Sequence, residues 1–184
     1  KWNKVYNLTA LRDPQEILTH HLLDSLSAVG PLMHQTRPLG GAFSFLDVGS
    51  GGGLPGVVIA ICCPGVNVTC VDAVSKKAAF VQQVAASLKL GNLKGLHARV
   101  ETLSGPFDVI GSRAFASLPD FVNWSSGALA DGGVWMAMKG KLPEEEMSAL
   151  PSMAQVFHVE QLLVPGLNAE RCMIWMKKST ALSA

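Results

Sequence analysis

The sequence lacks several features that mark whole classes of protein. Basic residues outnumber acidic ones by only one, so a globally basic nucleic-acid binder is excluded and any RNA contact must come from a local patch. No apolar run reaches the roughly 20 residues that span a bilayer. No signal peptide opens the printed sequence, and no repeat is present. We expect a cytoplasmic protein, free of membrane contact and monomeric.

Cysteine and histidine are too few and too scattered for a metal site. The four cysteines are Cys62, Cys63, Cys70 and Cys172. They form no C-x-x-C pair and lack the density of a secreted disulfide scaffold. We expect them to act as small core residues in a reducing compartment. The five histidines are dispersed apart from His20 and His21, so the sequence predicts no structural metal.

Apolar residues are plentiful enough for one core. With 184 residues, of which 48% are hydrophobic and 16% charged, the chain fits a single α/β domain and not two. Residues 1–184 are therefore interpreted as one domain, with an N-terminal helical cover over 1–41 and a core over 42–178. The first residue is Lys1 rather than methionine, so we expect further residues upstream.

The most informative stretch is a glycine cluster between two apolar runs. The first run closes on Asp47 and the second follows Gly56, which predicts a buried strand, a tight turn and a helix. Asp47 with Gly49, Gly51 and Gly53 matches the first motif of class I S-adenosylmethionine-dependent methyltransferases. Gly51-x-Gly53-x-x-Gly56 fits the dinucleotide fingerprint of an oxidoreductase instead. A glycine-rich turn without a ligand is the third alternative.

Two residues favour the methyltransferase interpretation. Asp47, at the strand end ahead of the glycines, is placed to accept a hydrogen bond from the ammonium of a methionine group and would repel a pyrophosphate. Pro55 suits the first position of a helix. Asp72 then ends a second strand about 20 residues beyond the glycines, where a carboxylate reaches the ribose hydroxyls of a nucleoside. It could alternatively do no more than cap the following helix.

The remaining pattern predicts an α/β fold with a mostly parallel sheet and an antiparallel hairpin at its C-terminal edge. Strands are expected at 43–48, 66–72, 96–98, 107–110, 134–138, 154–164 and 171–177, and helices at 57–62, 75–90, 117–129 and from 143. In such sheets ligands bind at the carboxyl ends of the strands. The loops that follow these strands are therefore the candidate site.

The N-terminal region leaves its role open. A helix is expected from Asp13-Pro14 to a stop at Gly30-Pro31. His20, His21, Asp24 and Ser25 fall on its polar face or margin, where solvent exposure is the default and a site-facing role for His20 or Asp24 is the alternative. Residues 1–12 mix aromatics, amides and cations, which could bind RNA by stacking and phosphate contacts or could simply cover the sheet.

Six strings of residues carry a resemblance to a known family. They are Lys1-Trp-Asn-Lys, Tyr6-Asn-Leu-Thr, His21-Leu-Leu-Asp-Ser25, Leu46-Asp-Val-Gly-Ser-Gly-Gly-Gly-Leu-Pro-Gly56, Ser112-Arg-Ala-Phe-Ala116 and Met138-Lys-Gly140. The chain resembles the RsmG (GidB) family from its first residue to about Lys177. The resemblance implies a Rossmann-like class I methyltransferase fold that transfers a methyl group from S-adenosylmethionine to N7 of a guanine in bacterial 16S ribosomal RNA of the small ribosomal subunit. It also implies a helical segment ahead of the Trp-Asn string.

The resemblance and the residues together define a candidate cofactor site. The resemblance implies cofactor contacts at Gly49, Leu54, Val100, Glu101 and Arg113. The motif analysis adds Asp47, Gly51, Gly53 and Asp72. Two alternatives remain to be weighed against this cofactor: a nicotinamide-dependent oxidoreductase, and a non-catalytic ribosome-binding factor with a vestigial pocket.

The chemistry that the resemblance implies needs no general base. Guanine N7 carries a free lone pair, so the protein's task is to align the reactants and exclude water. Candidates for positioning are Arg113, Lys139, His20 and Asp24. Arg113 and Lys139 follow strand ends, where they could hold phosphate or the guanine O6 edge or be ordinary surface cations. The candidate RNA-binding cations are Lys1, Lys4, Arg12, Lys139 and Lys141.

Overall fold

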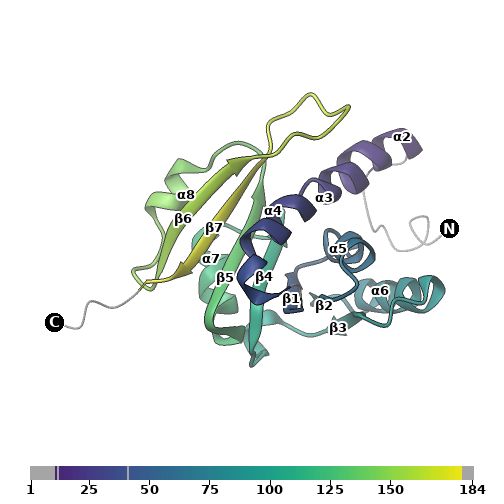
Figure 1. Cartoon of the computed structure of the whole chain (residues 1–184), viewed down its shortest axis with the longest axis horizontal. Helices are drawn as coiled ribbons and strands as arrows, with labels where there is room; N and C mark the ends of the chain where they lie inside the picture. Colours follow the sequence, from purple (N-terminus) through teal and green to yellow (C-terminus); the bar gives the residue numbers. More distant parts are fainter. Residues whose placement is uncertain (1–10, 12, 41, 180–184) are drawn as a thin grey trace.

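The computed structural model describes Leu11, residues 13–40 and residues 42–179, and seven strands within these residues form one sheet. The strand order is β3-β2-β1-β4-β5-β7-β6 (Figure 1). The strands are β1 (Ser44–Val48), β2 (Asn67–Asp72), β3 (Leu93–His97), β4 (Phe107–Arg113), β5 (Leu129–Lys139), β6 (Ala154–Gln161) and β7 (Cys172–Lys178). The first five strands in that order pair in parallel, and β7 runs antiparallel to β5 and β6. The predicted sheet and its C-terminal hairpin are confirmed.

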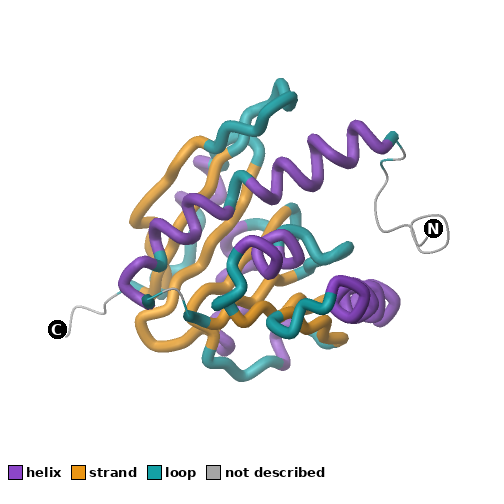
Figure 2. Tube along the Cα trace, turned by 45° about the vertical axis from the view of Figure 1, so that its right-hand side comes forward, coloured by secondary structure: helices purple, strands orange, loops and turns teal. Residues whose placement is uncertain are grey.

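Helices cover both faces of the sheet. They are α2 (Pro14–Ile17), the π-helical turn η1 (Leu18–Leu23), α3 (Asp24–Leu26), α4 (Val29–Gln35), α5 (Gly56–Cys62), α6 (Ser75–Leu88), α7 (Leu118–Ser125) and α8 (Glu144–Ser148), with short 3-10 turns at Arg37–Leu39, Val100–Thr102 and Ser126–Ala128. Figure 2 shows helices in front of the strands and behind them. Such double cover explains why the parallel strands are apolar on both sides.

Strand β1 shows how the two layers are built. Phe45 packs on one face of the sheet, in the cluster that contains residues of α4, α5 and α6. Leu46 and Val48 pack on the other face, in the cluster that contains residues of α7. Successive side chains of a strand point to opposite faces, so Asp47 shares the face of Phe45. This alternation determines where the Asp47 carboxylate lies.

The N-terminal helix does not end where the sequence predicts. The expected stop at Gly30-Pro31 is wrong, because after a turn at residues 27–28 the chain continues as α4. Pro31 lies in the first turn of α4, where a backbone nitrogen has no helical partner and a proline is tolerated. The helical cover therefore extends across the sheet as consecutive helical segments, which Figure 1 shows from α2 to α4.

The N-terminal helical cover buries two polar residues that were expected on its solvent-exposed face. Asp24 and Ser25 are 2% and 0% exposed, so solvent exposure is wrong for both. Leucines at helical spacing face outward instead: Leu18, Leu22 and Leu26 are all exposed. A π-helical turn holds one more residue than an α-helical turn and shifts the side chains that follow. The turn η1 directly precedes Asp24, so a strictly α-helical wheel does not describe this face.

Smaller differences concern single elements. Strand β3 begins at Leu93, earlier than the expected residue 96, and Leu93 is buried opposite Val68 of β2. Of the four cysteines, all of which are free thiols, Cys62 is exposed and does not act as a core residue. No helix in the described part of the chain is long and apolar enough to cross a bilayer. Within the same residues, no group of three or more His, Cys, Asp or Glu side chains is placed to hold a metal ion.

Candidate active site

Three glycines of the loop between β1 and α5 adopt the left-handed backbone conformation. Gly49, Gly51 and Gly53 have φ values of 63°, 58° and 83°, a region that side-chain-bearing residues rarely adopt. Around Gly51 there is open space, because a Cβ there would meet nothing closer than the Gly49 carbonyl oxygen at 4.0 Å. At Gly53 a Cβ would collide with Val57, so this glycine serves packing and lines neither of the cavities described below.

Asp47 lies beneath this loop and not in front of it. Its side chain is completely buried, and its Oδ2 accepts a hydrogen bond of 2.8 Å from the Gly56 N–H at the start of α5. Its Oδ1 has no partner within the described chain. Burial raises the pKa of the Asp47 carboxyl to about 7, against the opposing effects of the Gly56 N–H and the Arg113 guanidinium. The expected contact with a methionine ammonium is thus corrected, since Asp47 anchors the loop to α5 from below.

Asp72 connects the loop to the end of β2. Its Oδ2 accepts from the Gly51 N–H at 3.0 Å and lies 3.8 Å from the ammonium of Lys77, while its Oδ1 accepts from the Val74 N–H at 2.8 Å. The capping alternative is wrong, because the N-cap residue of α6 is Val74 and no side chain makes a capping hydrogen bond there; Asp72 orders the turn ahead of the helix instead. Each carboxylate oxygen has a second lone pair, so Asp72 keeps capacity for a ligand hydroxyl.

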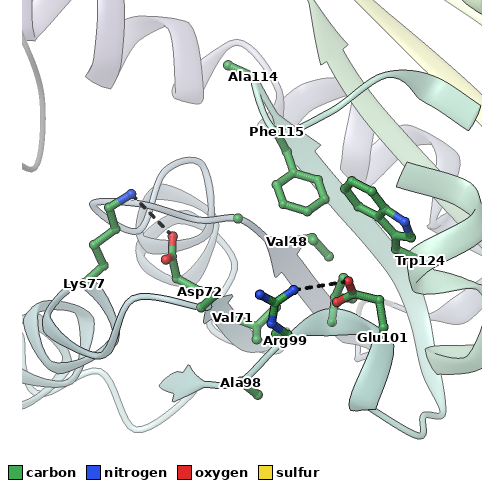
Figure 3. A pocket seen from close by; sticks show the side chains of 13 residues that line it. Val48, Val71, Asp72, Lys77, Ala98, Arg99, Glu101, Ala114, Phe115 and Trp124 are labelled. Atoms are coloured by element: carbon green, nitrogen blue, oxygen red, sulfur yellow. Dashed lines mark ion pairs between the residues drawn. The ribbon is translucent and has the colours of Figure 1, made fainter. Parts of the chain in front are cut away.

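A first cavity of about 430 Å³ opens beside this carboxylate at the ends of β1, β2 and β4. Asp72 and Lys77 stand on one side of it, and Glu101 and Trp124 stand on the other (Figure 3). Its lining contains Val48, Gly49, Val71, Asp72, Ala73, Lys77, Ala98, Arg99, Val100, Glu101, Ala114, Phe115 and Trp124. Four of the sequence-predicted cofactor residues meet here: Gly49, Asp72, Val100 and Glu101.

A second cavity of about 560 Å³ adjoins the first, and Gly49 and Ala114 line both. Its lining contains Leu11, His20, His21, Asp24, Gly49, Ser50, Gly51, Gly52, Leu54, Arg113, Ala114, Met138, Lys139, Gly140 and Arg171. The N-terminal cover and the sheet therefore enclose this space together. Gly51, Leu54, Arg113 and the positioning candidates His20, Asp24 and Lys139 all lie here. Asp24 is buried against this space, whereas His20 borders it and is also solvent-exposed, so a positioning role for either residue stays a prediction.

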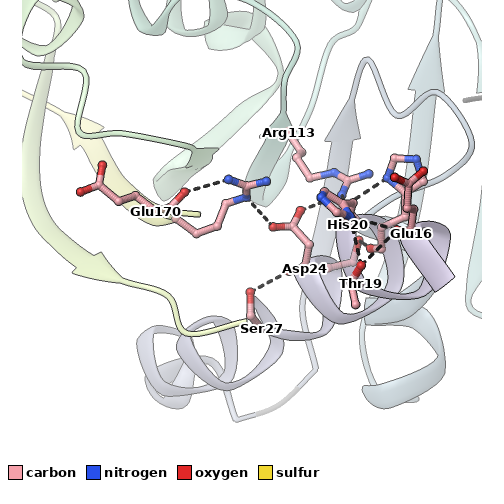
Figure 4. A network of polar contacts seen from close by, with 10 residues as sticks. Glu16, Thr19, His20, Asp24, Ser27, Arg113 and Glu170 are labelled. Carbon is pink, nitrogen blue, oxygen red and sulfur yellow. Dashed lines mark hydrogen bonds and ion pairs between the residues drawn. The ribbon is translucent and has the colours of Figure 1, made fainter. Parts of the chain in front are cut away.

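Buried Asp24 binds two guanidinium groups at the wall of the second cavity (Figure 4). Its Oδ2 accepts from Arg113 at 2.7 Å and its Oδ1 from Arg171 at 2.8 Å. Arg113 also donates to the His20 carbonyl oxygen at 3.2 Å. Charge-assisted hydrogen bonds of this length are among the strong ones in proteins. One carboxylate thus holds together α3, the end of β4 and the start of β7.

The sequence analysis missed Arg171, although its topology contains a signal. β7 runs antiparallel to β5, and Cys172 pairs with Lys139 at the carboxyl end of β5. The start of an antiparallel strand therefore lies at the same edge as the ends of the parallel strands. Any polar residue just before β7 is consequently a site candidate, and Arg171 occupies that position.

The two histidines lie at the rim of the second cavity in different surroundings. Partial burial, followed by the nearby positive charge of Arg113, lowers the pKa of His21 below its usual value. His21 is therefore neutral at physiological pH. The ring of His20 is within hydrogen-bond distance of the Thr19 hydroxyl at 3.0 Å and of the Glu16 carbonyl oxygen at 3.2 Å.

Lys139 is engaged with protein atoms rather than free for RNA. Its ammonium donates to the Ala116 carbonyl oxygen at 2.9 Å and to Glu146 at 2.8 Å, and its side chain is 18% exposed. Glu146 in turn accepts from the Leu118 N–H at 2.6 Å. Lys141, in contrast, is exposed. The other three RNA-binding candidates, Lys1, Lys4 and Arg12, lie outside the described residues.

Comparison with known proteins identifies what this geometry belongs to. The family model of rRNA small subunit methyltransferase G (GidB) matches residues 1–174. The chain belongs to this family. The ribosomal RNA small subunit methyltransferase G of Paracidovorax citrulli (strain AAC00-1) is 64% identical over 186 residues, with 96% of this chain and 76% of that protein covered. The protein of the same name from Acidovorax ebreus (strain TPSY) is 67% identical over 183 residues, with 96% and 81% covered.

Solved structures agree on the fold at low sequence identity. The N-methyltransferase NodS from Bradyrhizobium japonicum WM9, in complex with S-adenosyl-L-homocysteine, matches with a TM-score of 0.69 and 13% identity, covering 97% of this chain and 98% of that one. TrmN from Thermus thermophilus matches with a TM-score of 0.62 and 18% identity, covering 92% and 55%. The class I methyltransferase fold is confirmed. As a member of the rRNA small subunit methyltransferase G family, the chain is an S-adenosylmethionine-dependent rRNA methyltransferase. The alternative of a nicotinamide-dependent oxidoreductase is therefore wrong.

The residues present fit S-adenosylmethionine. The open space at Gly51 lets a ligand approach the loop backbone where a side chain would block it. Asp72 borders the first cavity with spare acceptor capacity for ribose hydroxyls. The apolar and aromatic lining from Val100 to Trp124 suits a planar base.

Proposed function

We propose that this enzyme methylates N7 of a guanine in bacterial 16S ribosomal RNA, with the cofactor's nucleoside in the first cavity and the target base in the second. The observation that carries the proposal is that the two cavities meet at Gly49 and Ala114. A donor in one cavity is then adjacent to an acceptor in the other, and such alignment supplies much of the rate enhancement of a two-substrate reaction.

In the first cavity the protein's task is to bind and orient. The backbone at Gly49 would approach the methionine part closely, with Gly51 facing that part from the adjoining second cavity, and Asp72 would accept from the ribose hydroxyls. Val100, which is 5% exposed, and Glu101 would contact the base. Of these residues, Gly49, Val100 and Glu101 are contacts that the family resemblance implies, whereas Gly51 and Asp72 come from the motif analysis.

In the second cavity, Arg113 and Arg171 provide planar, permanently charged donors that suit the guanine O6 edge or a phosphate. Asp24 fixes both guanidinium planes, so their orientation is set before RNA binds. When bound, S-adenosylmethionine supplies a methyl group on a positively charged sulfur, which a ring nitrogen with a free lone pair accepts without first losing a proton. No side chain is therefore assigned as a general base.

The proposed substrate also suggests how the protein works in the cell. We infer a monomer as the active unit. A small ribosomal subunit or its 16S RNA is the partner, and the reaction would take place in the cytoplasm, where ribosomes are assembled.

Mass mapping of 16S RNA from cells with and without the gene tests the proposal. We expect one guanine that carries a methyl group at N7 only when the gene is present, and restoration of the methyl group by the wild-type gene. Arg113→Ala should fail to restore it, and Asp131→Ala, at an exposed position near the start of β5, should succeed. Unchanged RNA after deletion, or a methyl group on another atom, would refute the proposal.

The absence of a general base has a kinetic test. The single-turnover rate at saturating RNA and cofactor should be nearly flat from about pH 6 to pH 8. A required histidine base would give a tenfold rise per pH unit below its pKa, which is about 6.5 for an unperturbed imidazole. A rise that disappears in His20→Gln or His21→Gln, yet persists in Asp47→Asn, would show that a histidine takes the proton.

A further inference from the structure

Trp124 lines the first cavity, and the function described so far uses it only as part of the apolar lining. It projects from α7 and is 40% exposed, whereas Trp135 and Trp175 are fully buried. Figure 3 places it across the cavity from Asp72. A half-exposed tryptophan on the wall of a ligand cavity has apolar surface left to cover, because large aromatic side chains gain most from burial.

The position of Trp124 is set by both ends of α7. At the first turn, the Ser117 hydroxyl accepts from the Asp120 N–H at 3.2 Å, and Glu146 accepts from the Leu118 N–H. One residue after Trp124, the buried Ser125 hydroxyl accepts from the Trp135 indole N–H at 2.9 Å. The helix is thereby tied to β5, so the indole is held in place rather than carried on a loop.

Phe115 continues the surface that Trp124 begins. The two rings meet edge to face, with centroids 5.8 Å apart and an interplanar angle of 77°. The Phe115 ring also lies over Gly49, where a Cβ would overlap it. We call Phe115 and Trp124 the aromatic wall. It runs from the glycine loop, where the cavities join, to the outer end of the first cavity.

The orientation of the bound nucleoside follows from the residues that line each part of the first cavity. This step rests on the proposed function. The reactive end must lie near Gly49 and Ala114, which border the second cavity, and the ribose must lie near Asp72. The base then extends toward Glu101 and Trp124. In adenosine the six-membered ring with its N6 amino group points away from the ribose, so that edge of the base faces the outer end of the aromatic wall.

We propose that Trp124 is a cofactor-specificity residue, which closes the outer end of the base subsite and excludes adenine rings that carry a substituent on N6. The indole covers the base of the natural cofactor and occupies the space that a larger N6 group would need. A smaller side chain at this position opens that space without touching Asp72 or the glycine loop. The aromatic wall would thus set the size of the nucleoside that the enzyme accepts.

Calorimetric titration with S-adenosylhomocysteine and with its N6-benzyl derivative tests the proposal on the wild type, Trp124→Ala and Trp124→Phe. We expect the wild type to bind the unsubstituted compound and to reject the derivative. Trp124→Ala should bind the derivative about ten- to a hundredfold more tightly than the wild type does, and the unsubstituted compound more weakly, as expected for a change in one apolar contact. Asn123→Ala, the exposed neighbour on α7, is the matched control and should match the wild type.

Tryptophan fluorescence gives a second readout that does not depend on the alanine variant being folded. S-adenosylhomocysteine should quench the wild-type emission, and Trp124→Phe should lose that quenching while it retains binding. If Trp124→Ala loses affinity for both compounds equally, or quenching persists in Trp124→Phe, Trp124 is not part of the base subsite. If the wild type binds no S-adenosylhomocysteine at all, the proposed cofactor itself is refuted.

Discussion

Replacing Asp24 with asparagine isolates the charge of one buried carboxylate at almost constant shape. The Asp24 side chain is 4% exposed and accepts hydrogen bonds from Arg113 and Arg171 at 2.7 and 2.8 Å. Asparagine keeps one accepting oxygen, but its amide nitrogen would face a guanidinium donor. Two positive charges would then lie close together without a compensating charge.

The magnitude can be worked out from the exposure of the three partners. Removing one partner of a fully buried ion pair costs about 3–5 kcal/mol. The side chains of Arg113 and Arg171 are 17% and 24% exposed, so water compensates part of their charge, and we expect about 2–3 kcal/mol for Asp24→Asn. For a domain of this size that corresponds to a fall in Tm of about 5–10 °C.

Thermal unfolding and single-turnover methyl transfer measure the two consequences. Because the first cavity does not contain Asp24, affinity for S-adenosylhomocysteine should change much less than the transfer rate. The rate should fall about a hundredfold if the guanidinium groups shift by about 1 Å. The exposed Asp131→Asn is the control for an acid-to-amide change.

A double-mutant cycle decides whether the network is the cause. With Asp24→Asn and Arg171→Leu combined, the loss of stability should be smaller than the sum of the two single losses, since both variants break the same contact. Strict additivity, or an unchanged Tm in Asp24→Asn, would refute the account of Asp24 as the shared partner.

Burial raises the pKa of Asp47 in the folded protein to about 7, from 3.8 for an ordinary aspartate. Between these two pH values the folded protein keeps a proton on Asp47 that the unfolded chain has already released. The free energy of unfolding should therefore fall by about 2–3 kcal/mol from pH 5 to pH 8. In urea unfolding, Asp47→Asn should not show this decrease. Gly51 has a φ of 58°, which valine rarely adopts and asparagine tolerates. Gly51→Val should therefore lose both cofactor affinity and stability, whereas Gly51→Asn should lose affinity alone. Calorimetric titration measures the affinity and urea unfolding measures the stability. Lys141→Ala should lower the slope of log affinity against log salt for RNA by about one, and equal slopes for wild type and variant would remove Lys141 from the RNA surface. Lys139→Met should instead lower Tm, because Glu146 loses its positively charged partner and keeps only the hydrogen bond from the Leu118 N–H.

The local parts of the fold could be read from the sequence because they depend on neighbouring residues. The apolar run, the glycines and the helix that follow one another from β1 to α5 are a contiguous signal, and Asp72 follows at a fixed spacing. The burial of Asp47 could also have been derived, since strand alternation places it on the face of Phe45 and α5. The ligand contact expected for Asp47 was thus wrong for a reason that the sequence contains.

The second cavity could not be derived in this way because its wall is assembled over long separations. Asp24 meets Arg113 across 89 residues and Arg171 across 147. Helical periodicity treats Asp24 as a polar residue on a solvated face, and only the tertiary pairing shows that it is buried. The same holds for Lys139, whose position after a strand end suggested a phosphate contact but whose partner, Glu146, is determined by how α8 folds back.

The ion pair that joins Asp24 to Arg171 also orders events during synthesis. A chain emerges from the ribosome N-terminus first, so Asp24 and the whole parallel part of the sheet are made before Arg171 exists. The second cavity therefore lacks one of its two guanidinium groups until translation has almost reached the last strand. A product that stops before β7 would contain every glycine of the cofactor loop and still have an incomplete place for the target base.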